Sequence, residues 1–502
     1  MSRLAGPAFV CILALFLSLP AAALAPPVPE GPLAQVASTD GFAALPALAY
    51  RPGGDLLLIT NGASWDFESC LRGFAPCAGG PLAGHVLDRF APTPFGVPSA
   101  VGETLGRPQM ARQIEIAPGP GSAFLVAWED DLYCNIRGNS CQGGDVGSSG
   151  IAARLFADVG RPAGSTLRVN TTLPGDQTHP AVAALGSTGY VVVWQSRASA
   201  GTNWNVLGRR FDLQGEPLGG ELTLPEGSAG DRQEPAVAAA ADGSFLVVFR
   251  RTVDGSPAIS GVSGLSGLFA RRFAADGTPA AGEVQIDEGG AEGAPAAPAV
   301  VALAGGGFAV AWRGDVGSPL VANLWVRRLD ALGVPQGEPL RANVQAVDAP
   351  DPSASNPNPV RPSLAADGTG GFLVAWLNHA AATGGGAVVP VYASYFGPPA
   401  ETPVREIEVA RAGAPFALRV AADGDHAYTV LWGRFAPGLP GSSIDLYEAR
   451  RFTLPGGACT PGPGTLCLAG GRFRVEARWH DQHNEKLGDG SALPFSDATG
   501  LF

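Results

Sequence analysis

The sequences PAVAALGSTGYVVVWQ at residues 180–195 and NVLGRRFDLQGEPLGGELT at residues 205–223 decide the fold of this chain. The first contains two short apolar runs, AVAA and YVVVW, separated by the turn sequence GSTG. The second contains the runs VLGRRF and ELT, joined by a connection rich in Gly and Pro. Runs of about 4–7 residues bounded by Gly, Pro and Asp predict β-strands, and none has the period of a helix. The stretch therefore predicts a unit of four short strands.

The same unit recurs along the chain and can be counted by the large ring that closes its second strand. Successive ring positions lie 55 to 68 residues apart, which gives seven copies. We expect these rings to be core residues buried between neighbouring sheets rather than ligand contacts. In the first copy Thr60 takes the position, and the rings are Trp128, Trp194, Phe249, Trp312, Trp376 and Trp432.

A second repeated pattern is an aromatic residue or Leu, three residues, Gly, one residue and Pro. In the first copy two extra residues intervene, giving Phe90, Gly96 and Pro98, and around Phe396 the pattern decays. It is kept in Phe156-Gly160-Pro162, Phe211-Gly215-Pro217, Phe273-Gly277-Pro279 and Leu329-Gly333-Pro335.

A four-stranded unit without a second layer must stack on copies of itself. Four to eight such units form a β-propeller, so we predict an all-β, seven-bladed propeller over residues 26–456. Six blades plus an unusual segment is the alternative, because the first copy is the most divergent. The last copy breaks at Pro455 before a fourth strand, and the segment Glu30–Ala37 resembles Glu216–Thr223. We expect this amino-terminal segment to supply the missing outer strand and close the ring, which removes two open sheet edges.

Residues 1–25 have the form of a secretory signal. Arg3 is the basic start, Phe9–Leu19 the apolar core and Ala21–Ala25 the region of small residues at which cleavage occurs. The apolar core is too short to span a membrane comfortably, and no other segment approaches the required length. We expect the protein to be secreted, extracellular or periplasmic, and monomeric.

Composition narrows the classes of partner. The 502 residues carry a net charge of −12, which disfavours nucleic acids and anionic membranes. Hydrophobic residues make up 46%, which argues against disorder. A protein or polysaccharide ligand is the remaining expectation.

The cysteines fit an exported protein. Apart from Cys11 there are six, in three close pairs. Fifteen pairings are formally open to six cysteines, and the equivalent places of the first two pairs in their repeats favour local disulfides. A zinc site is the weaker interpretation, because the spacing is wide and no His lies near. The expected disulfides are Cys70 with Cys77, Cys134 with Cys141, and Cys459 with Cys467.

The candidate binding face lies in the loops between the second and third strands, which are long at 61–81, 129–150 and 378–388. Acidic residues in these loops suit a calcium ion, but no EF-hand spacing is present and solvated loop tips are the favoured interpretation. These acidic residues are Asp66, Glu68, Glu129, Asp130, Asp131 and Asp145.

Two further patterns have structural interpretations. We expect the Asp-Gly pairs at Asp242, Asp276, Asp367 and Asp423 to form hairpin turns. Each double Arg of the third strand should place its two side chains on opposite faces of the sheet, one near acidic groups of the neighbouring blade and one in solvent. A ring of Arg around a channel is the alternative. The pairs are Arg209-Arg210, Arg271-Arg272, Arg327-Arg328 and Arg450-Arg451.

No motif nominates a catalytic residue or a cofactor. The sequence lacks a G-x-S-x-G, an H-E-x-x-H and a phosphate-binding loop. His480 and His483 are close together but lie outside the repeats.

Two resemblances go with these patterns. The repeats, with the sequences PAVAA, GYVVVW and GRRFDLQG, resemble a family of bacterial extracellular β-propeller-like proteins, which implies the fold and export more than an activity. The tail, with CL at 467–468, GRFRV at 471–475 and Trp479, resembles the first part of a small β module found at the carboxyl end of many secreted bacterial proteins. This resemblance implies an incomplete module over residues 457–502.

The sequence thus favours a secreted, non-enzymatic propeller that binds a protein or polysaccharide through its loop face. The alternative is a carbohydrate-active hydrolase or lyase with a carboxylate pair carried by the loops, and a structural cell-surface repeat is a third hypothesis. An enzyme requires carboxylates that converge in one central pocket, whereas a binding protein requires only a broad face.

Overall fold

A computed structural model describes most of the strands of the seven repeats. The described residues are 34–36, 47–50, 56–60, 83–87, 94–100, 109–132, 149–158, 161–172, 175–199, 202–227, 230–252, 267–288, 294–316, 321–344, 347–348, 361–378, 388–398, 403–413, 415–423, 427–437, 443–453, 467–468 and 473–477.

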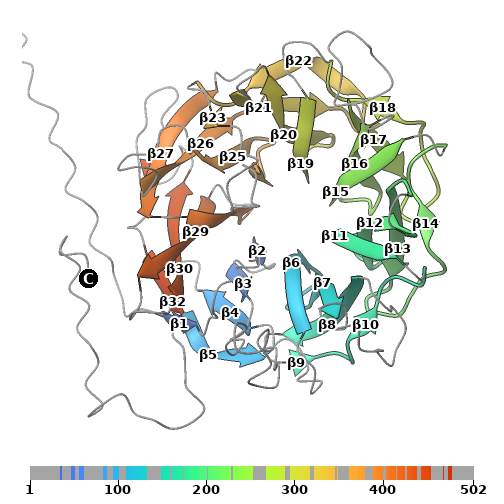
Figure 1. Cartoon of the computed structure of the whole chain (residues 1–502), viewed down its shortest axis with the longest axis horizontal. Coiled ribbons are helices and arrows are strands. Elements are labelled where there is room, and N and C mark those ends of the chain that lie inside the picture. Colours follow the sequence, from blue (N-terminus) through green and yellow to red (C-terminus); the bar gives the residue numbers. More distant parts are fainter. Residues whose placement is uncertain are drawn as a thin grey trace, which may run out of the picture.

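These residues form seven sheets, here called blades 1 to 7, that follow one another around a ring (Figure 1). Blade 1 contains β2 (Ala47–Tyr50), β3 (Leu56–Thr60), β4 (Ala83–Leu87) and β5 (Pro94–Ala100). Blade 2 contains β6 (Gln109–Pro118), β7 (Phe124–Leu132), β8 (Gly150–Asp158), β9 (Arg161–Pro162) and β10 (Leu167–Arg168). Blade 3 contains β11 (Asp176–Ala184), β12 (Tyr190–Arg197), β13 (Asn205–Phe211) and β14 (Leu222–Thr223).

The remaining blades repeat this order. Blade 4 contains β15 (Asp231–Ala239), β16 (Phe245–Thr252), β17 (Gly267–Phe273) and β18 (Val284–Gln285). Blade 5 contains β19 (Ala294–Ala302), β20 (Phe308–Val316), β21 (Val321–Leu329), β22 (Pro335–Arg341) and β23 (Val347–Asp348). Blade 6 contains β24 (Ser363–Ala366), β25 (Phe372–Leu377), β26 (Val388–Phe396) and β27 (Val404–Gly413). Blade 7 contains β28 (Pro415–Ala422), β29 (Ala427–Pro437), β30 (Ser443–Thr453), β31 (Cys467–Leu468), β32 (Phe473–Ala477) and β1 (Ala34–Val36).

The first strand of each blade lies innermost, and the later strands follow outward in antiparallel pairs (Figure 1). The predicted all-β, seven-bladed propeller is therefore confirmed. The described residues contain no helix, and so none that could cross a membrane. Residues 1–25, the expected secretory signal, lie outside the described residues, so export stays a prediction.

The expected disulfides are not tested by the structure. Cys467 belongs to β31, but its side chain is not among those described. The pairing of the cysteines therefore stays a prediction. The other five cysteines of the three pairs lie outside the described residues, and they are Cys70, Cys77, Cys134, Cys141 and Cys459.

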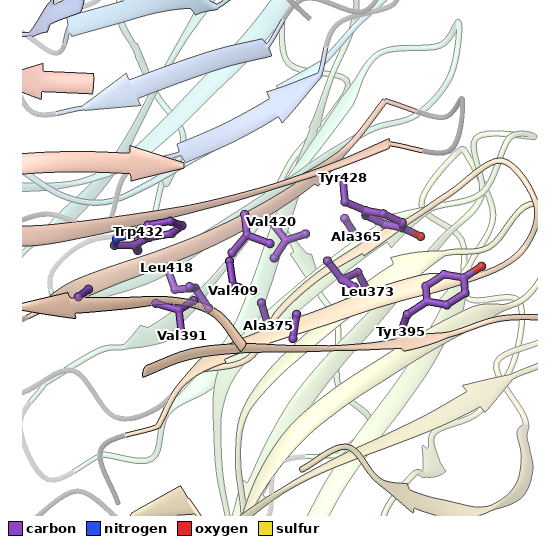
Figure 2. Packing of buried hydrophobic residues seen from close by; sticks show 13 residues of the cluster. Ala365, Leu373, Ala375, Val391, Tyr395, Val409, Leu418, Val420, Tyr428 and Trp432 are labelled. Carbon is purple, nitrogen blue, oxygen red and sulfur yellow. The ribbon is translucent and has the colours of Figure 1, made fainter. Parts of the chain in front are cut away.

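The rings at the end of the second strands are buried between blades, as the repeats predict. Each of these six side chains exposes 1% of its surface or less and packs against apolar side chains of the preceding blade. Figure 2 shows one such interface, in which Trp432 and Leu418 of blade 7 face Val391 and Val409 of blade 6. The side chain of Thr60 lies outside the described part of the chain.

Truncation of one of these rings should destabilise the whole ring of blades. Trp194→Ala leaves a cavity among Leu125, Ala153 and Val169 of the preceding blade, and we expect it to lower the free energy of unfolding by about 3–5 kcal/mol. Leu332→Ala is the control, because this side chain is 64% exposed and its loss should change stability by less than about 0.5 kcal/mol. Equilibrium denaturant unfolding measures both. Equal, small effects would contradict the packing role of the ring.

The aromatic-Gly-Pro pattern is the hairpin between the third and fourth strands. In each kept copy the aromatic residue or Leu is the cross-strand partner of the Pro six positions later, as in Phe211↔Pro217 and Leu329↔Pro335. In the three copies whose glycine is described, the Gly of the pattern has a positive φ, which turns the chain without the steric cost that a side chain brings. These values are +84° at Gly215, +84° at Gly277 and +85° at Gly333.

The Asp-Gly pairs form turns, with one difference. Asp242-Gly243 and Asp276-Gly277 have a positive φ at the glycine, as expected. In the turn that follows Asp367 the positive φ falls instead at Gly370, and the Asp367 carboxylate accepts the N–H groups of Thr369 and Gly371. Gly424 lies outside the described residues.

The first arginine of each double Arg binds the preceding blade. Arg209 donates to the carbonyl oxygen of Val169, at 3.2 Å. Arg271 and Arg327 each add an ion pair with an acidic residue of the preceding blade, as expected. The hydrogen bond from the first arginine to a backbone carbonyl oxygen of the preceding blade recurs in three other blades. The pairs are Arg271 with Leu224 (2.8 Å), Arg327 with Ile286 (2.6 Å) and Arg450 with Val409.

The second arginine corrects the prediction, because it does not extend into solvent. It points to the opposite face and donates to a turn carbonyl of the following blade. The pairs are Arg210 with Ala275 (3.0 Å), Arg272 with Ala331 (3.1 Å) and Arg328 with Gly370 (3.0 Å). None of the described double arginines lines the central cavity, which is bounded by the innermost strands. The Arg-lined channel is therefore also wrong for these pairs, and they serve as clamps between blades.

Replacing a clamp arginine by lysine should cost stability although the charge is kept. Arg271→Lys removes the planar fork that reaches both Ala281 O and Leu224 O, and we expect a loss of about 1–3 kcal/mol in the free energy of unfolding. The matched control is Arg411→Lys, whose partner Glu408 lies on the exposed surface three residues away. If the two variants unfold at the same denaturant concentration, the clamp role is wrong.

The last blade differs from the prediction in one place. The amino-terminal strand β1 joins its sheet, as expected, but it is not the fourth strand. That position is taken by β32, which pairs antiparallel with β30, and β1 lies parallel to β32 one place further out. The tail strand β32 thus covers the open edge of β30. Blade 7 meets blade 1 through side chains, including a 2.7 Å hydrogen bond between the hydroxyl groups of Thr429 and Tyr50.

Candidate active site in the central cavity

The innermost strands surround a cavity of about 300 Å³ at the centre of the ring. All seven blades contribute to its wall, which consists largely of Ala, Val, Leu and Pro side chains. This volume is at the lower end of the range for small-molecule sites. The wall also contains the polar and charged side chains of Gln113, Glu115, His179, Arg361, Ser363 and Arg419.

The inner strands contain β-bulges, and two of these bulges place the polar residues Gln113 and His179 in the cavity wall. The innermost strands of blades 2 to 5 each shift register, and a residue other than Gly adopts a positive φ there. Such conformations are costly and cluster at functional sites, where a bulge redirects a side chain. The residues are Gln113 (46°), His179 (56°), Glu234 (54°) and Ala297 (51°).

Side chains at neighbouring blades hold these bulges in place. The N–H of His179 donates to Glu129 at 3.3 Å, and the N–H of Glu234 donates to Gln195 at 2.9 Å. The N–H of Ala297 donates to the Glu234 carboxylate at 2.5 Å. Glu129 and Gln195 each follow the buried Trp of their blade, so the ring packing and the cavity wall are linked through adjacent residues.

Glu115 and Arg419 form an ion pair across the wall. Their Oε1 and Nη2 atoms lie 3.1 Å apart, and the pair joins blade 2 to blade 7. Glu115 exposes 36% of its side chain, but this surface faces the cavity, where protein surrounds it. Burial raises the pKa of Glu115, although the charges of Arg419 and Arg361 act in the opposite direction. Glu115 therefore retains its proton to a higher pH than an ordinary glutamate.

Glu234 lies beside the cavity and has the opposite shift. It precedes the lining residue Pro235, and Arg250 lies 3.4 Å from its carboxylate. Burial acts to raise its pKa, but the charges of Arg250 and Arg361 and the hydrogen bond from Ala297 hold the pKa below its usual value. Glu234 is thus a carboxylate under conditions in which Glu115 still titrates.

His179 is a neutral imidazole at neutral pH. Burial lowers its pKa to about 4, and the positive charge of Arg361 contributes to this shift while Glu234 opposes it. The ring atom Nδ1 lies 3.2 Å from the Thr178 hydroxyl. A neutral ring beside the cavity can accept a proton.

Arg361 completes the group from blade 6. Arg361 directly precedes a Pro, as His179 and Glu234 do at the equivalent positions of their blades. Its charge is close enough to Glu115 and to Glu234 to be affected by both. Among the described residues it donates no hydrogen bond, in contrast to the clamp arginines.

The low pKa of His179 predicts an acid-sensitive ring. The folded state holds this imidazole neutral while the unfolded chain protonates it near pH 6.5, so its contribution is present above that pH and is lost as the pH falls toward about 4. We expect His179→Gln to remove up to about 3 kcal/mol of the stability difference between about pH 7.5 and about pH 4. Denaturant unfolding at both values measures it. An unchanged pH dependence in the variant would show that His179 is not the group responsible.

The structure and the sequence place the site differently. Asp66, Glu68 and Asp145 lie outside the described residues, as do the side chains of Asp130 and Asp131, so a calcium site in the loops stays a prediction. Glu129 is buried and accepts the His179 N–H, so it belongs to the bulge rather than to a loop tip. His480 and His483 are also outside the described part. Across the described ranges, no three His, Cys, Asp or Glu side chains are placed to hold a metal ion.

Apart from Glu129 beside it, none of the cavity residues was predicted from the sequence patterns. Their signal was a polar residue directly before the apolar start of the inner strand, visible in THPAVA, QEPAVA and VRPSLA. This position can be found by comparing the repeats. The comparison does not show the β-bulge, which turns the side chain at this position toward the centre of the ring.

Comparisons with known proteins leave the family open. No protein-family model matches the chain, and no curated protein is recognisably related to it. Solved structures resemble its fold at low identity. An α-L-arabinanase of Penicillium chrysogenum complexed with arabinobiose has a TM-score of 0.42 and 13% identity over 68% of this chain and 92% of its own. An α-L-arabinofuranosidase of Fusarium graminearum gives 0.43 and 13% over 71% and 93%.

A further similar structure is a protein of unknown function from Dyadobacter fermentans. Its TM-score is 0.42, with 10% identity over 84% of this chain and 98% of its own. At these values the likenesses transfer no activity to this chain.

Proposed function

We propose that this protein is a carbohydrate-active enzyme that cleaves glycosidic bonds in the central cavity. The observation that carries the proposal is the pair Glu115 and Glu234, which have opposite pKa shifts beside one cavity. Glycoside hydrolysis requires one carboxyl group that can give a proton and one that is already ionised. Two titratable groups whose environments separate their pKa values fit these two roles.

In this proposal Glu115 is the proton donor and Glu234 the base or nucleophile. Glu115 gives its proton to the glycosidic oxygen as the bond to the sugar breaks, and the Glu234 carboxylate either activates a water molecule or attacks the sugar carbon. Arg250 and the Ala297 N–H keep Glu234 ionised. The charge of Arg361 acts to lower the pKa of both carboxyl groups.

This proposal differs from the function that the sequence favoured. A binding protein requires no titratable pair, whereas an enzyme requires carboxylates at a pocket. Glu115 in the cavity wall and Glu234 next to the lining residue Pro235 support the enzyme hypothesis. The carboxylates lie on inner strands and not on loops. The loop-face binding function and the monomeric state stay predictions, and we include export in the proposal because of residues 1–25.

Conservative substitution tests the two roles. Glu115→Gln should lower turnover of a polysaccharide by about 10²–10⁴-fold, because the amide cannot donate the proton. An aryl glycoside with an acidic phenol as leaving group should largely restore turnover in Glu115→Gln but not in Glu234→Gln, because such a leaving group departs without protonation. Reducing-end release from neutral and acidic polysaccharides, and phenol release, are the measurements.

Glu408→Gln is the matched control, since Glu408 is exposed on blade 6 and pairs with Arg411 there. It should leave all rates unchanged. Absence of cleavage across the panel by the wild-type protein, or full activity in both cavity variants, would refute the enzyme proposal.

His179 supports a second candidate reaction, which is cleavage by β-elimination. Its imidazole lines the cavity and is the candidate base that would remove a proton from a sugar carbon beside a carboxylate group while Glu115 protonates the leaving oxygen. The product then carries a double bond and absorbs ultraviolet light. Hydrolysis gives no such absorbance, so the product identifies the reaction, and loss of the absorbance in His179→Gln assigns the base.

A further inference from the structure

Among the described residues, Arg361 is a cavity residue whose guanidinium has no partner at hydrogen-bond or ion-pair distance. Its side chain lies in the cavity wall, and the described residues provide it with no hydrogen-bond acceptor and no ion pair within contact distance. The other wall arginine, Arg419, is engaged by Glu115 at 3.1 Å. Clamp arginines such as Arg327 are engaged at both ends of the guanidinium. A partly buried guanidinium without a hydrogen-bond acceptor destabilises the folded state. An anion bound in the cavity would supply the missing acceptor.

The charge balance of the wall agrees with an anionic ligand. The wall itself contains two guanidinium groups, Arg361 and Arg419, and one carboxyl group, Glu115, which is paired with Arg419. The whole protein has a net charge of −12, so this positive lining is opposite in sign to the rest of the molecule. Glu234, beside the wall, is already engaged by Arg250 and by the Ala297 N–H.

We propose that Arg361 binds the carboxylate of a uronic acid residue, and that the cavity therefore selects uronate-containing glycans over neutral ones. A guanidinium matches a carboxylate by two parallel hydrogen bonds, a geometry that lysine does not reproduce. The amide of Gln113 in the same wall can bind sugar hydroxyl groups beside it. The choice of a glycan rests on the proposed function, whereas anion binding by Arg361 does not require any turnover.

Calorimetric titration of the full-length protein tests the specificity without relying on activity. The probes are oligogalacturonate, oligoglucuronate, the neutral galactose and glucose oligomers of the same length, and a sulfated galactose oligomer. The wild-type protein should bind at least one uronate oligomer about 10- to 100-fold more tightly than its neutral counterpart. Added salt should reduce the difference.

Three variants locate the interaction. Arg361→Gln should remove the preference for the uronate while leaving the weak binding of the neutral oligomer, and Arg361→Lys should retain part of it. Arg411→Gln, an exposed arginine on blade 6, should bind as the wild type does. A thermal melt of each variant confirms that it is folded, and the wild-type comparison of charged and neutral oligomers stands even if one variant does not fold.

The outcomes separate this inference from the proposed function. Equal affinity of the wild type for uronate and neutral oligomers, or an unchanged preference in Arg361→Gln, overturns the inference. Tighter binding of the sulfated oligomer also overturns it, since it assigns the site to sulfate. Selective uronate binding without cleavage supports the inference and contradicts the enzyme proposal, whereas cleavage of neutral glycans unaffected by Arg361→Gln does the reverse.

Discussion

The burial of each sheet between two neighbours is the constraint on which this structure depends. A four-stranded blade has two apolar faces, and within its own unit nothing covers either of them. The large ring at the end of the second strand packs against the preceding blade in six consecutive interfaces. Burial of one such side chain stabilises by roughly 1.5–3 kcal/mol or more, and the contribution recurs around the ring. The fold is stable because every blade serves as the core partner of the next.

Polar groups make the same interfaces specific. The described double arginines reach one blade back and one blade forward and bind backbone carbonyls, to which Arg271 and Arg327 add ion pairs with acidic side chains. A guanidinium satisfies several acceptors in a fixed plane, which sets the angle and height of adjacent sheets more closely than apolar packing does. In blade 6 the hydroxyl of Ser394 replaces the first arginine and donates to Ala342 O at 2.8 Å. The equivalent carbonyl is therefore satisfied there by a smaller group.

Much of the architecture could be predicted from the repeats. The strand pattern around Val191, the buried position of Trp194 and the turn at Gly215 follow from local rules on alternation, ring burial and positive φ. The fourth strand of the last blade could not be predicted in the same way, because the sequences 30–37 and 473–477 both satisfy the rules for an outer strand. Which of the two segments pairs with β30 depends on their competition for the free edge of that strand. Local sequence patterns give no information about such a competition.

The site was less accessible to sequence reasoning. Glu115 and Arg419 are separated by 304 residues, and Glu234 and Arg361 lie in different repeats, where each precedes a Pro at the equivalent position but is a different type of residue. Their proximity results from ring geometry, which converts equivalent positions in a repeat into a circle around one point. A bulge with a left-handed residue then decides which side chain faces that point. Periodicity identifies the strand but not the direction of this one residue.

The ion pair between Glu115 and Arg419 has a consequence for assembly. It joins blade 2 to blade 7, which come close together only when all the blades between them have formed. A propeller with a missing blade therefore has no central site. Folding must bring distant segments together before that site exists, and such long-range topologies form slowly. A molecule bound in the central cavity would contact side chains from several blades at once. Because it binds only the closed propeller, it would stabilise that state against partial unfolding and proteolysis.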